Sequence, residues 1–124
     1  ERGEMKVAIS SAGYSPEALV DSRFGRCACF VVYDTESGQR SFESNPYRIT
    51  GEDAALKAAQ MLLSSGVKRV YAGQFGIRVE EFFQKKGVQM VVLTRPFVVA
   101  DILMMFEKCR GATEQNIDRN TRKE

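Results

Sequence analysis

The chain has 124 residues, which suits one domain with a core large enough to fold without a disulfide or a structural metal. Hydrophobic residues make up 44% and charged residues 27%, which excludes wholesale disorder, and the net charge of +2 gives no case for nucleic-acid binding. No run of about 18 apolar residues occurs, and the N-terminus lacks a signal pattern. We therefore expect a cytoplasmic protein with no membrane partner, whose three cysteines are reduced.

The first half of the chain predicts a strand, a long loop and a hairpin. Residues 1–4 precede a methionine that reads as a native start, so we interpret them as an N-terminal extension or expression remnant. An apolar strand is expected over residues 6–10. The loop over residues 11–26 is long for a compact domain, polar and poor in apolar anchors, so it is expected to be functional and mobile. Strands over residues 29–34 and 40–44, joined by a turn, predict a hairpin.

The second half alternates helices and strands. Ala55, Ala59, Leu62 and Leu63 form one apolar stripe and predict a helix that Gly66 ends. The pattern continues with a strand over residues 68–73, a helix over 77–86, a strand over 88–93 and a helix over about 98–109. We expect one domain over residues 5–110 and a polar, disordered tail over 111–124.

This element order predicts an α/β protein with a five-stranded mixed sheet flanked by three helices. Right-handed crossovers would make the strands over residues 6–10, 68–73 and 88–93 parallel. Ligands collect beyond the carboxyl ends of parallel strands. One crevice is therefore expected at that edge, rimmed by Ser10, Ser11, Gly13, residues 73–76 and residues 94–96.

The loop over residues 73–76 (GQFG) is one candidate binding element. Its glycines permit close approach of the backbone to an anion, and the following helix contributes its positive end. A plain strand-to-helix turn would have the same sequence. Arg23 and Arg26 could add positive charge, although loop arginines are often only solvated.

The cysteines of the stretch RFGRCACF, residues 23–30, are the second candidate. In a regular strand, Cys27 and Cys29 would share a face about 7 Å apart and could straddle a metal site or small cluster. Packing is the alternative for reduced cysteines. Cys27 precedes the strand beside arginines that should ease its ionisation, so we interpret it as the metal ligand and Cys29 as packed. Cys109 is expected at the edge of the core.

Several site classes are disfavoured. The chain has no histidine and no Cys-x-x-Cys pair, which argues against zinc fingers, thioredoxin-type motifs and histidine-dependent triads. The first strand, KVAIS, carries no carboxylate, which disfavours hydrolysis by two metal ions.

Three stretches, DSRFGRCACFVVYD, ESNPYRITGEDAALKAAQMLLSSGVKRVYAG and FGIRVEEFFQKKGVQMVVL, together resemble the dinitrogenase iron-molybdenum cofactor biosynthesis family. The most specific element of the resemblance is the tripeptide Phe24-Gly25-Arg26. Two further positions, Asn45 and Gly51, also match the family. The resemblance implies a ribonuclease-H-like fold and a non-catalytic role as carrier of an anionic metal–sulfur cluster.

The chain departs from that family at two places. Arg23 stands where many relatives have histidine, and arginine does not ligate metals at ordinary pH. Cys27 and Cys29 stand where relatives commonly have small or aromatic residues, so these thiols are a feature of this chain.

Chemistry and resemblance together favour a binding protein, not an enzyme, for an anionic iron–sulfur or molybdenum–sulfur cluster that is held transiently. Its partners would be cluster donor or acceptor proteins, with no nucleic acid, and it would be a monomer or weak homodimer. The alternatives are a regulatory or protein-interaction module without a cluster, and an enzyme acting on a small anion. The predicted cofactor-binding residues, with Cys27 as the metal ligand, are Arg23, Phe24, Gly25, Arg26, Cys27, Gly73, Gln74, Phe75 and Gly76.

Overall fold

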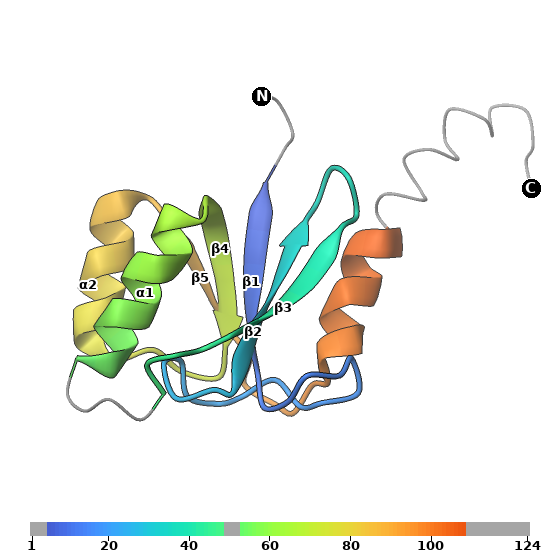
Figure 1. The fold of residues 1–124 in the computed structure, drawn as a ribbon, viewed down its shortest axis with the longest axis horizontal. Coiled ribbons are helices and arrows are strands. Elements are labelled where there is room, and N and C mark those ends of the chain that lie inside the picture. The colour runs from blue at the N-terminus through green and yellow to red at the C-terminus, as the bar shows by residue number, and fades with distance from the viewer. Residues whose placement is uncertain (1–4, 49–52, 109–124) are drawn as a thin grey trace, which may run out of the picture.

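The computed structural model describes residues 5–48 and 53–108, which form an α/β domain with one sheet between two layers of helices (Figure 1). The sheet has five strands: β1 (Lys6–Ser11), β2 (Cys29–Asp34), β3 (Arg40–Ser44), β4 (Val67–Ala72) and β5 (Gln89–Val92). The described helices are α1 (Ala54–Ser64), α2 (Ile77–Lys86) and a third over residues 99–108. The predicted extension, Gly51, Cys109 and the predicted tail lie outside the described residues.

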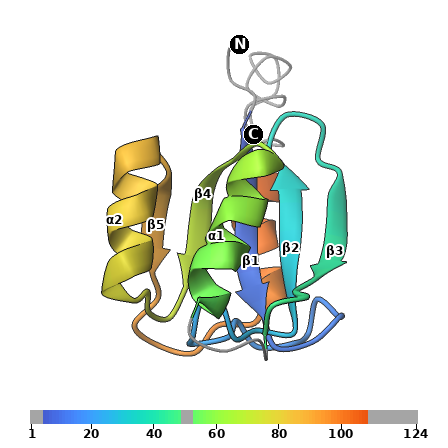
Figure 2. The same cartoon turned by 60° about the vertical axis from the view of Figure 1, so that its left-hand side comes forward.

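The strands lie in the order β3-β2-β1-β4-β5. β2 runs antiparallel to both β1 and β3, whereas β1, β4 and β5 are parallel. The predicted hairpin, the mixed sheet and its three parallel strands are therefore confirmed. The carboxyl ends of β1, β4 and β5 meet at one edge of the sheet, as Figure 2 shows.

Each face of the sheet has its own core. α1 and α2 cover one face, where Ala8 and Phe30 pack with Leu62 and Phe83. The helix over residues 99–108 covers the other face, where the core residues are Val7, Ile9, Val31, Tyr33, Tyr71, Val99, Ile102 and Leu103. Because side chains alternate between the faces of a strand, the central β1 is buried on both.

The loop between β1 and β2 is tied to the rest of the fold. Within it, Ala12 N–H donates to Leu19 O at 2.9 Å, and Val20 N–H donates to Phe97 O at 2.8 Å. Phe24 and Cys27 are buried in the core. The loop is thus not poor in apolar anchors, and that reason for expecting it to be mobile was wrong.

Among the described residues, no helix has the length and apolar character needed to cross a membrane.

The two neighbouring phenylalanines of α2 provide a test of the core. Phe83 is fully buried, whereas Phe82 is only partly buried. We expect Phe83→Ala to lower the free energy of unfolding by about 3–5 kcal/mol, because it removes a buried ring and leaves a cavity. Phe82→Ala is the matched control and should cost clearly less. Chemical denaturation followed by circular dichroism measures both losses, and equal losses would contradict the described packing.

Candidate functional site

The turn that carries Phe24, Gly25 and Arg26 is held by the buried side chain of Asn45. Its Nδ2 donates to Gly25 O at 3.0 Å and to Cys27 O at 3.1 Å. Its Oδ1 accepts a hydrogen bond from Tyr47 N–H at 3.1 Å. Asn45 therefore joins the end of β3 to the turn and fixes the turn's position.

Gly25 lets this turn pack directly against α1. Its φ is +95°, a conformation that side chains rarely allow, and a Cβ would lie 2.6 Å from both Cα and Cβ of Ala55. Arg26 points outward from the same turn, and its Nη1 donates to Arg48 O at 3.0 Å. Arg26 is exposed but already engaged.

The loop after β4 lies against the loop after β1. Gly73 makes this possible, because a Cβ there would lie 2.6 Å from Ser22 Cα. Gly73 N–H donates to Asp21 O at 3.3 Å, and Phe24 N–H donates to Gln74 O at 3.2 Å. A parallel bridge joins Arg23 to Gln74. The structure thus brings together two stretches that are about fifty positions apart in the sequence.

Phe24 anchors this contact in the core. Its ring centroid lies 5.5 Å from that of Phe30, 5.4 Å from Phe75 and 5.7 Å from Phe83. Phe24 is only 5% exposed. Aromatic packing at these distances fixes the loop after β1 against the start of α2.

A hollow of about 350 Å³ opens beside this contact, and we call it the Arg23 hollow. It is lined by Arg23, Phe24, Gln74, Phe75, Gly76 and Ile77. Most of the predicted cofactor-binding residues therefore meet here. Gly25, Arg26 and Cys27 do not line it, and Gly73 lines a neighbouring cavity instead.

Two features of the Arg23 hollow favour an anion, although Glu80 in the first turn of α2 places one negative charge on the same helix. Arg23 is exposed, and α2 begins at Ile77 after Gly76, which supplies no side-chain cap for the first backbone N–H groups. These N–H groups and the helix dipole favour an anion at the start of α2. The aromatic wall makes the same hollow partly apolar.

Cys27 does not reach the Arg23 hollow. It is fully buried in the core that also holds Phe24 and Phe30. Burial raises the pKa of the Cys27 thiol to about 11, so the expectation that nearby arginines ease its ionisation was wrong. Its role as a metal ligand stays a prediction, which requires the thiol to become accessible.

Cys29 is also buried and is held differently. Its thiol donates to Gly13 O at 3.1 Å, and burial raises its pKa. Since Cys27 lies outside the regular strand, the two thiols are not arranged as successive same-face residues of β2. Within residues 5–48 and 53–108, no group of three or more metal-ligating side chains is placed to hold a metal ion.

A second hollow of about 480 Å³, which we call the Arg95 cavity, opens on the other side of the Arg23–Gln74 contact. It is lined by Ala12, Leu19, Val20, Asp21, Ser22, Gly73, Leu93, Thr94, Arg95 and Pro96. The predicted crevice is confirmed for Gly73 and residues 94–96. Ser10 and Ser11 are buried, and Gly13 is not part of the lining. Sequence reasoning missed residues 19–22, because they lie in the middle of a loop.

Comparisons with known proteins give this site a context. The family model for the dinitrogenase iron-molybdenum cofactor matches residues 5–108. The structure is similar to the apo form of the orange protein from Desulfovibrio gigas, with a TM-score of 0.76 and 26% identity over 85% of this chain and 88% of that chain. It is also similar to a putative NifB protein from Thermotoga, with a TM-score of 0.72 and 29% identity over 86% and 90% of the two chains.

More distant likeness shows the fold alone. A putative dinitrogenase from Methanocaldococcus jannaschii is 17% identical, with a TM-score of 0.57 over 85% of this chain and 90% of that chain. Among curated proteins, none matches the sequence.

Asn45 offers a test of how the turn is positioned. Asn45→Ala would leave the carbonyls of Gly25 and Cys27 without this donor in a buried place. We expect the free energy of unfolding to fall by about 2–4 kcal/mol. Asn45→Asp keeps the acceptor for Tyr47 N–H but loses the donor, so it should also destabilise. Urea denaturation measures both, and an unchanged Asn45→Asp variant would contradict the role of Nδ2.

Cys27 predicts a pH dependence of stability. Its folded pKa of about 11 lies above the ordinary value of 9.0, so the unfolded state loses the proton first as pH rises. The protonated Cys27 thiol therefore contributes its full share to the free energy of unfolding below about pH 9, and this share is lost as pH rises toward about 11. Between about pH 8 and about pH 11, wild type should lose about 2 kcal/mol more stability than Cys27→Ala. Denaturation curves at both pH values measure this difference, and equal losses would show that the thiol ionises normally.

Proposed function

The chain belongs to the dinitrogenase iron-molybdenum cofactor family, and from this premise we propose that it is a non-catalytic carrier of an anionic iron–sulfur or molybdenum–sulfur cluster. The Arg23 hollow is the proposed binding site of the cluster. The observation that carries the proposal is the meeting of an exposed arginine, the start of α2 and an aromatic wall in one hollow.

The charges in the hollow suit an anionic cluster. Bridging sulfides carry negative charge and accept hydrogen bonds, so a guanidinium and backbone N–H groups are suitable partners. Arg23 and the first turn of α2 supply both kinds of donor. The partly buried ring of Phe75 would contact the polarisable sulfur surface of the cluster.

Weak ligation supports a carrier role. Among the residues that the structure describes, no thiol lines the Arg23 hollow, so the cluster would be held by hydrogen bonds and charge. Such contacts form and break without deprotonating a ligand. The cargo could then pass to an acceptor protein after arriving from a donor protein.

The fold supports the same proposal at a coarser level. We propose that the domain is ribonuclease-H-like, and the pairing of a central β1 with antiparallel β2 on one side and parallel β4 on the other supports this finer class. The orange protein is similar over most of this chain, and its solved structure is the apo form. A ligand-free form of a similar protein supports the proposal that this chain also binds and releases a ligand.

The test is an anaerobic titration with tetrathiomolybdate, a molybdenum–sulfur anion with visible absorption. We expect saturable binding by wild type and about tenfold weaker binding by Arg23→Gln, because one charge-assisted contact is lost. Arg40→Gln removes the same charge from the β3 edge and serves as the matched control, with unchanged affinity.

The remaining outcomes are equally specific. Equal binding by wild type and Arg23→Gln would place the site elsewhere. Loss of binding in Cys27→Ser would show that the buried thiol becomes a ligand. Absence of binding by wild type, with tetrathiomolybdate and with a reconstituted iron–sulfur cluster, would favour an interaction module without cargo.

A further inference from the structure

The Arg95 cavity has features that the cluster proposal does not use. Its volume of about 480 Å³ is larger than that of the Arg23 hollow and lies within the range of small-molecule sites. Leu19, Val20, Leu93 and Pro96 make its lining mostly apolar. It lies beyond the carboxyl ends of parallel β4 and β5, where α/β sheets bind ligands.

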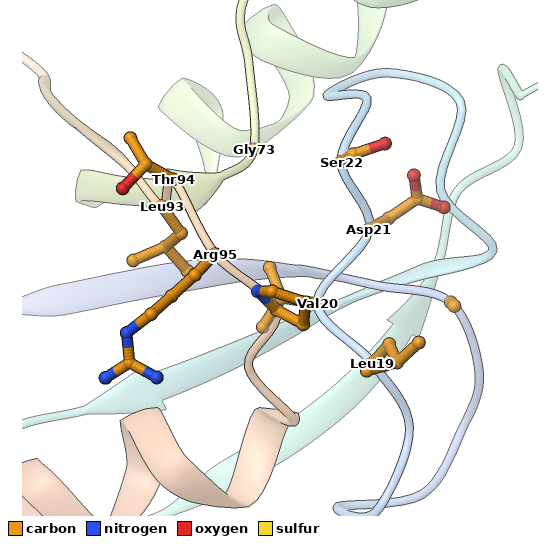
Figure 3. A pocket seen from close by; sticks show the side chains of 10 residues that line it. Leu19, Val20, Asp21, Ser22, Gly73, Leu93, Thr94 and Arg95 are labelled. Carbon is orange, nitrogen blue, oxygen red and sulfur yellow. The ribbon is translucent and has the colours of Figure 1, made fainter.

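The polar groups of this cavity stand on opposite walls. Figure 3 shows Asp21 and Ser22 on the loop after β1, and Thr94 and Arg95 across from them. The carboxylate of Asp21 and the guanidinium of Arg95 point away from each other, so they do not neutralise one another. The apolar residues are divided between the same walls: Val20 precedes Asp21 on the loop after β1, and Leu93 precedes Thr94 across from it.

The two charged side chains, Asp21 and Arg95, differ in the contacts that they make within the protein. Asp21 Oδ1 accepts a hydrogen bond from Arg23 N–H at 2.9 Å, which engages the carboxylate within its own loop. Arg95 lies over the Phe97 ring, with Cζ 4.2 Å from the ring centroid. Its guanidinium makes no hydrogen bond or ion pair to the other residues that the structure describes. Asp21 is thus partly engaged, whereas the N–H donors of Arg95 have no acceptor among the described residues.

We propose that the Arg95 cavity is a second binding site, which takes a small organic carboxylate with an apolar body. The apolar body lies against Val20, Leu93 and Pro96, and the carboxylate meets Arg95 at the rim. A planar guanidinium matches a carboxylate with two parallel hydrogen bonds. The contact with the Phe97 ring is not a hydrogen bond, so it leaves the N–H donors of the guanidinium available for this contact.

This site is separate from the proposed binding site of the cluster. Ser22 and Gly73 line the Arg95 cavity, whereas their chain neighbours Arg23 and Gln74 line the Arg23 hollow. The paired backbones of these residues form a wall between the two. Binding of the carboxylate therefore does not depend on the presence of a cluster.

The experiment uses cluster-free protein and three probes of similar shape: 4-phenylbutyrate, 4-phenylbutan-1-ol and 4-phenylbutylamine. We expect 4-phenylbutyrate to bind with a Kd of about 0.1–1 mM, as its size allows. The alcohol and the amine should bind about tenfold more weakly. Amide shifts in NMR titrations should be largest at Val20, Gly73 and Leu93.

Variants identify the group that selects the carboxylate. Arg95→Gln should weaken 4-phenylbutyrate about tenfold and leave the alcohol unchanged. Lys68→Gln removes a positive charge from an exposed position on β4 outside the cavity and should leave both affinities unchanged. Arg23→Gln, which tests the cluster site, should also leave them unchanged, so the two proposals fail separately.

Three results would overturn the inference. Equal affinity for the three probes would show that the cavity does not select a carboxylate. Preference for the amine would assign selection to Asp21 in place of Arg95. Shifts confined to residues outside the cavity, or no shifts at all, would show that the cavity is not a binding site.

Discussion

The contact between Ser22 and Gly73 is the constraint on which the functional edge of this protein depends. Only a residue without a side chain fits at position 73, because a Cβ would lie 2.6 Å from Ser22 Cα. This approach brings the backbone of residues 21–24 within hydrogen-bonding distance of residues 73 and 74. Without it, the loops after β1 and β4 would separate, and neither hollow would keep its walls.

Phe24 connects this surface contact to the core. Its ring packs with Phe30 of β2, Phe83 of α2 and Phe75 of the loop after β4. Gly25 then brings the turn against Ala55, and Asn45 holds the turn's carbonyls. The tripeptide Phe24-Gly25-Arg26, which suggested a binding site, thus mainly fixes the loop after β1 to the core. It presents Arg23 at the surface while Cys27 is drawn into the core.

The arrangement gives one sheet edge two different chemical environments. On one side of the shared wall lie Arg23 and the start of α2, which suit a compact inorganic anion. On the other side lies a larger, mostly apolar cavity with Arg95 at its rim. The difference arises because the loop after β1 contributes Arg23 and Phe24 to one side and Leu19 and Val20 to the other.

The sequence by itself determined the elements and much of the sheet. The spacing of apolar residues changes between periods of two and 3.6 along the chain. These changes predicted the hairpin and the helix α2, and the predicted bounds of β2, β3 and α2 are those observed. Such periodicity is a local property, because it records which side chains of one element are buried. Together with the handedness of crossovers, it also predicted that β1, β4 and β5 are parallel.

Only the tertiary structure decided the strand order and which loop residues meet. The sequence placed Cys27 beside arginines and suggested an ionisable ligand, yet the fold buries the thiol and raises its pKa. It also gave no sign that Leu19 and Val20 would form a wall with Leu93 and Pro96. Burial and proximity of this kind arise from contacts between residues distant in the chain, and no local pattern encodes those contacts.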